Sequence, residues 1–185
     1  MTKLRIACGV ALLAAVVAVT AARADEAEDA KKAVSGLVKD LEAKKDIAKK
    51  AEAAAKDHDL DYVMATFKPL DKRGRGGLGA GKLGDGIEKA IEKLSDKGIK
   101  AADLKAVQKD LVRLARVNLA VAEMTAHYSG ARAGAKKKLW ARYNDDMKKA
   151  ARGLLKAAEA GQADKIKALA TDLNAACTGC HSEFK

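Results

Sequence analysis

Apolar residues recur at steps of three and four through the second half of the chain, and this spacing predicts α-helices. The pattern favours a short helix over 85–97, ended by Gly98, and three long helices over 101–128, 136–160 and 163–184. The connections between these segments are short, and each apolar stripe is narrow. Successive helices of this kind pack antiparallel around a shared core. The pattern therefore predicts an all-α fold, an antiparallel helical bundle.

The N-terminal third adds an extended helix and a shorter one. The extended helix is expected from residue 25 to about residue 56. Its apolar stripe weakens around Lys44, so its first part is expected to project from the core. A short helix restarts after Asp59 and carries Met64, and Pro69 ends it because proline disfavours helical geometry in the preceding residue.

Residues 71–86 form a glycine-rich loop whose glycine spacing matches nucleotide-binding motifs. Two overlapping dinucleotide fingerprints begin at Gly74 and Gly79, and the run from Gly76 nearly spells a phosphate-binding loop, but Leu83 stands where Ser or Thr must hold magnesium. Both motifs also need a strand that leads into a helix, and the sequence has no strand pattern here. Nucleotide binding is therefore not expected, and the loop is expected to be flexible or to approach a flat surface closely.

The first 24 residues are predicted to be a cleaved signal peptide. Lys3 and Arg5 precede an apolar stretch over 7–20, and residues 22–24 fit the small-x-small cleavage rule. The apolar stretch is shorter than the about 20 residues that span a bilayer. Cleavage would discard Cys8 and leave one domain over 25–185, exported to the periplasm and without a membrane span.

The expected mature chain is basic. The whole sequence has 36 Lys and Arg against 25 Asp and Glu, and loss of Lys3, Arg5 and Arg23 leaves 33 against 25, a formal charge of +8. This balance favours acidic partners, although interleaved lysine and glutamate are also typical of solvated helix faces. Nucleic acid is not an expected partner, because the chain carries an export signal and lacks clustered basic and aromatic readers.

The strongest chemical signal is Cys177-Thr178-Gly179-Cys180-His181, the attachment signature of a c-type haem. Two thiols three positions apart on a helical turn can each add to one vinyl group of the same porphyrin. His181 can then supply an imidazole nitrogen as the proximal iron ligand. The motif predicts one covalently attached haem.

Other interpretations of this motif are weaker. A thioredoxin-like cysteine pair follows a strand, and none is predicted before Cys177. A structural zinc site needs four ligands, and His58 and His127 are distant in sequence. A disulfide between Cys177 and Cys180 would close too short a loop to stabilise the fold.

Counting from the turn at Gly161 places candidate pocket residues opposite the motif. Cys180 lies 19 residues after Gly161, and antiparallel neighbours match it to the residue 19 before the turn, beside Trp140 and Tyr143. Trp140, Tyr143 and Met147 are therefore expected to line a haem crevice. The sequence has no arrangement of acid, base and nucleophile that would indicate an enzyme.

The segment from about Leu139 to Phe184 resembles the class II c-type cytochromes, the cytochrome c′ family. The shared features are a tryptophan-bearing helix, an Ala-Gly-x-x-Asp turn at residues 160–164, and a haem motif close to the C-terminus. The resemblance implies a four-helix bundle that carries haem for electron transfer, and it implies a homodimer in many members. The alternative function is binding of a small gas such as NO or CO at an open sixth position of the iron.

The sixth iron ligand separates these two functions. In this family a methionine on the first helix gives a six-coordinate iron, whereas an apolar residue leaves the position open. Met64 is the candidate ligand in this chain, because it lies in a short apolar cluster before Pro69. Leu78 or Leu83 from the glycine-rich loop could instead cover an open iron, and His58 is a further alternative. Electron transfer is the first expectation because either coordination permits it.

Overall fold

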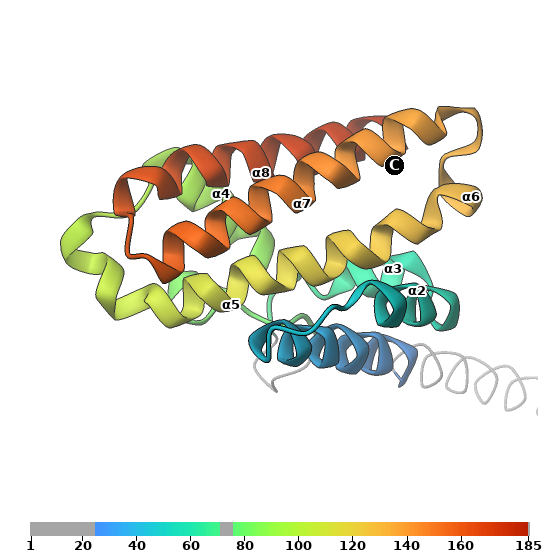
Figure 1. Cartoon of the computed structure of the whole chain (residues 1–185), viewed down its shortest axis with the longest axis horizontal. Helices are drawn as coiled ribbons and strands as arrows, with labels where there is room; N and C mark the ends of the chain where they lie inside the picture. Colours follow the sequence, from blue (N-terminus) through green and yellow to red (C-terminus); the bar gives the residue numbers. More distant parts are fainter. Residues whose placement is uncertain (1–24, 71–75, 185) are drawn as a thin grey trace, which may run out of the picture.

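Helices form nearly all the regular structure of the computed structural model, which describes residues 25–70 and 76–184. Three long helices lie side by side: α5 (Ala101–Thr125), α7 (Lys137–Glu159) and α8 (Ala163–Phe184) (Figure 1). The shorter α4 (Ile87–Lys97) packs along α8. In the described part of the chain the only β pairing is an isolated bridge between Leu70 and Gly76. The predicted all-α bundle is confirmed.

The turn between α7 and α8 sets their antiparallel alignment. Gly161 adopts φ +68°, in the left-handed region where glycine is favoured. Along the pair, a Cβ atom at Gly153 would lie 2.6 Å from Cδ2 of Leu169, so the two helices approach closely there. The start of α7 and the end of α8 consequently meet at the opposite end of the bundle.

The prediction of one helix over 25–56 is wrong. The structure has a helix over residues 25–42, an irregular stretch over 43–47, and then α2 (Ala48–Asp57). Lys44 interrupts the helix with φ +55°, and the carboxylate of Asp46 accepts a hydrogen bond from the backbone N–H of Ala48 at 2.9 Å. The first helix does not project from the core either, since Val34 and Leu37 are fully buried.

The N-terminal helices cover the side of α5 that faces away from α7. In Figure 1 the helix over 25–42 lies beneath α5, and Arg116 of α5 forms an ion pair with Glu42 at 3.3 Å. All six residues over 117–122 of α5 are buried. A helical stretch buried around its whole circumference lies at the centre of a fold, so this part of α5 runs through the centre of this one.

The described part of the glycine-rich loop packs against α5. Arg113 donates hydrogen bonds to the carbonyl oxygens of Leu78 and Gly79 at 2.9 and 3.1 Å. The carboxylate of Asp110 accepts one from the backbone N–H of Lys82 at 3.0 Å. Side chains of α5 therefore hold the backbone of the loop by hydrogen bonds. The loop includes a short 3-10 turn over Gly81–Leu83.

Two sequence predictions fall outside the described residues. They are the signal peptide over 1–24 and the first fingerprint glycine, Gly74. Of the helices that the structure describes, none is both long enough and apolar enough to cross a membrane.

Candidate functional site

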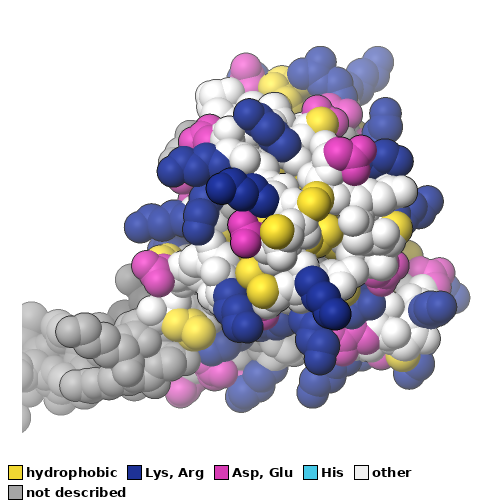
Figure 2. Space-filling view, turned by 90° about the vertical axis from the view of Figure 1, so that its left-hand side faces the viewer, with side chains coloured by type: hydrophobic (Ala, Val, Ile, Leu, Met, Phe, Trp, Pro, Cys, Tyr) yellow, Lys and Arg dark blue, Asp and Glu magenta, His cyan; other side chains and the backbone are white. Residues whose placement is uncertain are grey.

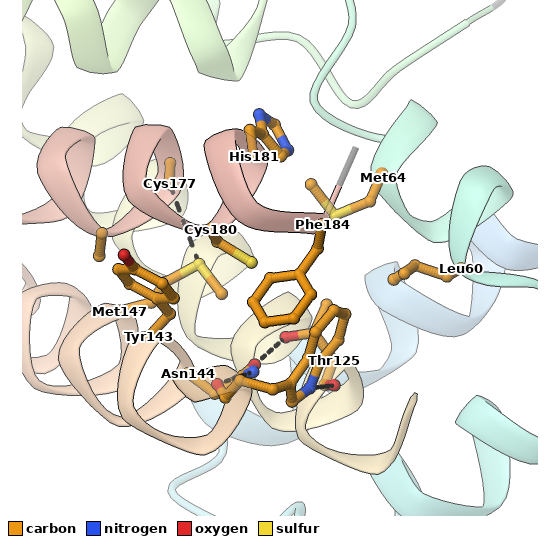
Figure 3. A pocket seen from close by; sticks show the side chains of 12 residues that line it. Leu60, Met64, Thr125, Tyr143, Asn144, Met147, Cys177, Cys180, His181 and Phe184 are labelled. Atoms are coloured by element: carbon orange, nitrogen blue, oxygen red, sulfur yellow. Dashed lines mark hydrogen bonds between the residues drawn. The ribbon is translucent and has the colours of Figure 1, made fainter. Parts of the chain in front are cut away.

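A mainly apolar pocket lies where the start of α7, the end of α8 and α3 (Leu60–Ala65) converge (Figure 3). The space between its walls, which is partly open to solvent, amounts to about 560 Å³. The lining residues come from four helices: Leu60, Met64, Thr125, Trp140, Tyr143, Asn144, Met147, Ala176, Cys177, Cys180, His181 and Phe184. The structure thus brings together the motif, the three expected crevice residues and Met64.

The two motif cysteines are free thiols in this pocket. Burial raises the pKa of Cys177 to about 12 and also raises the pKa of Cys180. Both are therefore neutral thiols at neutral pH. Thiol–disulfide exchange depends on a thiolate, and catalytic cysteine pairs lower the pKa of the attacking thiol. The direction of these shifts disfavours the thioredoxin-like alternative.

The structure also bears on the zinc alternative. Among the described residues, no group of three or more His, Cys, Asp or Glu side chains is arranged to hold a metal ion. The Cys177 thiol lies 3.9 Å from another sulfur, Sδ of Met147. The surroundings of the thiols are those of an apolar pocket.

A hydrogen-bonded group of three residues forms the floor of the pocket. The indole of Trp140 donates to the backbone carbonyl of Thr125 at 2.9 Å, and the Asn144 amide donates to the carbonyl of Trp140 at 2.8 Å. The Thr125 hydroxyl donates to Oδ1 of Asn144. All three side chains are buried, and their polar atoms satisfy one another. This network fixes the orientation of the tryptophan ring.

Two aromatic contacts complete the wall between α7 and α8. The rings of Trp140 and Phe184 meet edge to face, with centroids 5.0 Å apart and planes at 76°. A Cβ atom at Gly179 would lie 2.5 Å from Cε1 of Tyr143, so glycine between the two cysteines lets the helices approach here. The end of α8 is therefore held firmly against α7.

The wall opposite α7 comes from α3, and contacts far apart in sequence hold it there. Arg132 forms ion pairs with Asp59 and Asp61 at 3.0 and 3.2 Å. The Tyr128 hydroxyl donates a hydrogen bond to the backbone carbonyl of His58 at 2.6 Å. With α3 held in this way, the Met64 side chain points toward the end of α8 (Figure 3).

The rival distal residues lie elsewhere. Leu78 lines a separate hollow beside Arg113 and the helix over 25–42, and Leu83 is buried in the 3-10 turn of the loop. Neither these leucines nor His58 lines the pocket around Cys177. Met64 is the sequence-predicted distal candidate that the fold brings to this pocket.

Sequence reasoning missed Thr125, Asn144, Phe184 and Leu60. One signal for Asn144 was available, because it follows Trp140 by four positions and precedes Met147 by three, which puts a polar residue inside an apolar stripe. Buried polar residues are usually hydrogen-bonded to a specific partner. Thr125 could not be recognised as that partner without the packing of α5 against α7.

An all-helical bundle with Cys-x-x-Cys-His at the end of one helix and an apolar pocket beside it defines a c-type cytochrome. The sequence profile of the family described as Cytochrome C' matches residues 86–185, which is more than half of the chain. The chain belongs to the cytochrome c′ family and is a haem-binding c-type cytochrome. No curated protein and no solved structure matched it. The helix over 25–42, α2 and α3 precede the matched region.

The residues around the pocket fit haem. The lining is mostly apolar, as a porphyrin face requires, and it includes two free thiols and one imidazole in the attachment order. Haem, when bound, supplies an iron that alternates between the ferrous and ferric states.

Proposed function

We propose that Cys177 and Cys180 attach one haem covalently. Each thiol would add across one vinyl double bond, with sulfur forming the new C–S bond and the thiol proton going to the neighbouring carbon, so the addition would need no oxidant. Support comes from the two free thiols that open into one apolar pocket. Thr178 and Gly179 separate them by less than one helical turn, a spacing that suits two vinyl groups on one ring.

His181 and Met64 would hold the haem iron in this proposal. Both residues line the pocket from different helices, α8 and α3. A thioether ligand raises the reduction potential of haem iron relative to a second imidazole. The mostly apolar lining would limit the access of water to the iron ligands, and the Thr125–Asn144 pair holds Trp140 in the wall.

The proposed activity is electron transfer by an exported protein of the periplasm, with no catalytic reaction of its own. The single observation that carries it is the convergence of Met64 with the motif residues, because a filled sixth position suits outer-sphere electron transfer better than gas binding. Leu60 lies one helical turn before Met64 and also faces the pocket. It would form an apolar wall beside an open iron if Met64 did not bind, which is the arrangement for the alternative, binding of NO or CO.

The test is a spectroscopic redox titration of the haem-loaded protein, made in a host with export and haem-attachment machinery. Reversible one-electron cycling and a reduced spectrum that CO leaves unchanged on mixing are expected. Immediate and complete conversion to a CO adduct would contradict electron transfer through a six-coordinate iron and would favour gas binding.

A further inference from the structure

The end of the bundle that holds the pocket also carries an unbalanced group of basic residues. Between Glu123 and Asp145 the chain has no acidic residue, and it has five Lys or Arg. This stretch covers the end of α5, the connection through α6 (Ser129–Arg132), and the first two turns of α7.

Two of the five cations are neutralised by carboxylates. Arg132 pairs with Asp59 and Asp61, as described above, and Lys136 pairs with Glu183 at 2.8 Å. The remaining three are Lys137, Lys138 and Arg142. They are exposed, and none has a carboxylate oxygen within 4 Å in the described part of the chain. We call these three residues the α7 basic surface.

The position of this surface is unfavourable for the stability of α7. The helix begins at Lys137 and has no acidic residue in its first turn. The N-terminus of a helix carries partial positive charge, so lysines there are destabilising. Lys138 and Arg142 are also four residues apart, a spacing at which like charges repel on a helix. These charges therefore oppose the local preference of the helix, so the stability of α7 does not account for them.

The α7 basic surface adjoins the pocket directly. The guanidinium carbon of Arg142 lies 5.0 Å from the centre of the Tyr143 ring, and Tyr143 lines the pocket. The opposite end of the bundle differs: Figure 2 shows basic side chains there with acidic ones placed among them. On α7 itself, acidic residues resume only at Asp145 and Asp146.

We propose that the α7 basic surface docks an acidic electron-transfer protein beside the pocket. The inference rests on the proposed electron-transfer function and adds the place of contact and the charge of the partner. Complementary charge steers such encounters and raises their rates by about 10- to 1,000-fold at low salt. A partner that contacts Arg142 would be separated from the pocket only by the ring of Tyr143.

The experiment compares two charge-reversal variants of the haem-loaded protein with equal net charge. K137E/K138E changes the α7 basic surface, and K156E/K165E changes two exposed lysines near the Gly161 turn at the other end. The reductants are reduced flavodoxin, an acidic protein that gives one electron to the ferric form, and a neutral hydroquinone. Rate constants are measured as ionic strength rises from about 0.01 to 0.15 M, which shortens the Debye length from about 30 to about 8 Å.

The wild-type protein is expected to react quickly with flavodoxin at low salt and to slow as salt rises. K137E/K138E should react about 10-fold more slowly or worse at low salt, K156E/K165E should stay close to wild type, and the neutral hydroquinone should reduce all three proteins equally. K137E/K138E should also unfold at a higher temperature, because acidic residues suit a helix N-terminus. K137A/K138A repeats the comparison without reversing charge.

Equal slowing of both charge-reversal variants would overturn the proposal, because the effect would then belong to net charge. Absence of slowing in K137E/K138E would overturn it too. Binding of the wild type to anionic lipid vesicles, without salt-dependent reduction by flavodoxin, would assign the surface to a membrane instead. If the neutral hydroquinone reduces no variant at all, electron transfer itself fails; if it reduces them and flavodoxin rates ignore salt, only the docking proposal fails.

Discussion

The indole nitrogen of Trp140 donates a hydrogen bond to the backbone carbonyl of Thr125 at 2.9 Å, which ties the first turns of α7 to the last turn of α5. This bond holds the single tryptophan of the chain in the pocket wall. Its position beside the thiols turns the ring into a reporter for whatever occupies the pocket.

Tryptophan emission should therefore be weak in the native haem-loaded protein and should rise strongly on unfolding. The physical reason is energy transfer from the indole to the haem that Cys177 and Cys180 are proposed to hold, since all three residues line the same pocket. Fluorescence during urea unfolding measures it. The control is C177A/C180A, which should emit brightly in the folded state; bright emission from the native haem-loaded protein would contradict the placement.

The Thr125–Asn144 pair should contribute to stability as a unit. Asn144→Leu leaves the buried Thr125 hydroxyl without its acceptor in Asn144, and it should lower the free energy of unfolding by about 1–3 kcal/mol. The double variant T125V/N144L removes both polar groups and should cost less than the sum of the two single changes. Urea unfolding of the wild type, Thr125→Val, Asn144→Leu and the double variant measures the four free energies of unfolding. Strictly additive losses would show that the two side chains act independently.

The parts of the fold that sequence could predict are those with local causes. The apolar stripes of α5, α7 and α8 follow the helical period, so the approximate bounds of these helices could be predicted from the spacing of apolar residues alone. The position of Trp140 beside the motif followed from the short Gly161 turn, because residues equally distant from such a turn lie opposite each other in an antiparallel pair of helices. The structure ends α5 at Thr125 and continues it as a 3-10 turn over Ala126–Tyr128, a small difference from the predicted end at 128.

The parts that sequence could not predict depend on contacts between distant segments. The break near Lys44 needs a positive φ in a residue with no strong preference for it. Burial of Val34 and Leu37 depends on α5 having a second apolar face. The position of Met64 depends on Arg132, about seventy residues later in the chain. The sequence around Met64 contains no pattern that would predict the contact between Arg132 and Asp59.

Met64→Leu should remove the weak charge-transfer band that methionine-ligated ferric haem shows, and it should lower the reduction potential. Leucine is close in volume, so the change in stability should stay below about 1.5 kcal/mol. Met147→Leu is the matched control, because Met147 lines the same pocket but lies beside Cys177. Ferric absorption spectra and redox titrations measure both variants.

A wild-type spectrum without this band, together with immediate CO binding by the ferrous protein, would exclude Met64 as the ligand. Loss of the band in Met147→Leu but not in Met64→Leu would assign the sixth position to the other methionine.

Stability should fall in strongly alkaline solution because of Tyr128. Burial raises the pKa of its phenol to about 12, above the unfolded value of about 10. The folded state therefore keeps the proton more tightly, and the resulting stabilisation is complete below pH 10 and is lost as the pH rises toward 12. Tyr128→Phe should be less stable at neutral pH by about 1 kcal/mol, because the hydrogen bond to His58 is lost.

The measurement for Tyr128 is the free energy of unfolding from pH 8 to about pH 12 for both proteins, which differ only in the phenol hydroxyl. The difference between wild type and Tyr128→Phe should shrink as the phenol ionises. A constant difference across this range would show that Tyr128 does not contribute the alkaline transition.

Covalent attachment of haem at Cys177 and Cys180 is the central claim, and acid–acetone extraction of the denatured haem-loaded protein tests it most directly. The haem should stay with the polypeptide, and intact-mass analysis should show one haem added to the chain, located by digestion on the peptide that contains Cys177 to His181. Extraction of the haem into acetone, leaving a polypeptide of unmodified mass, would contradict the account.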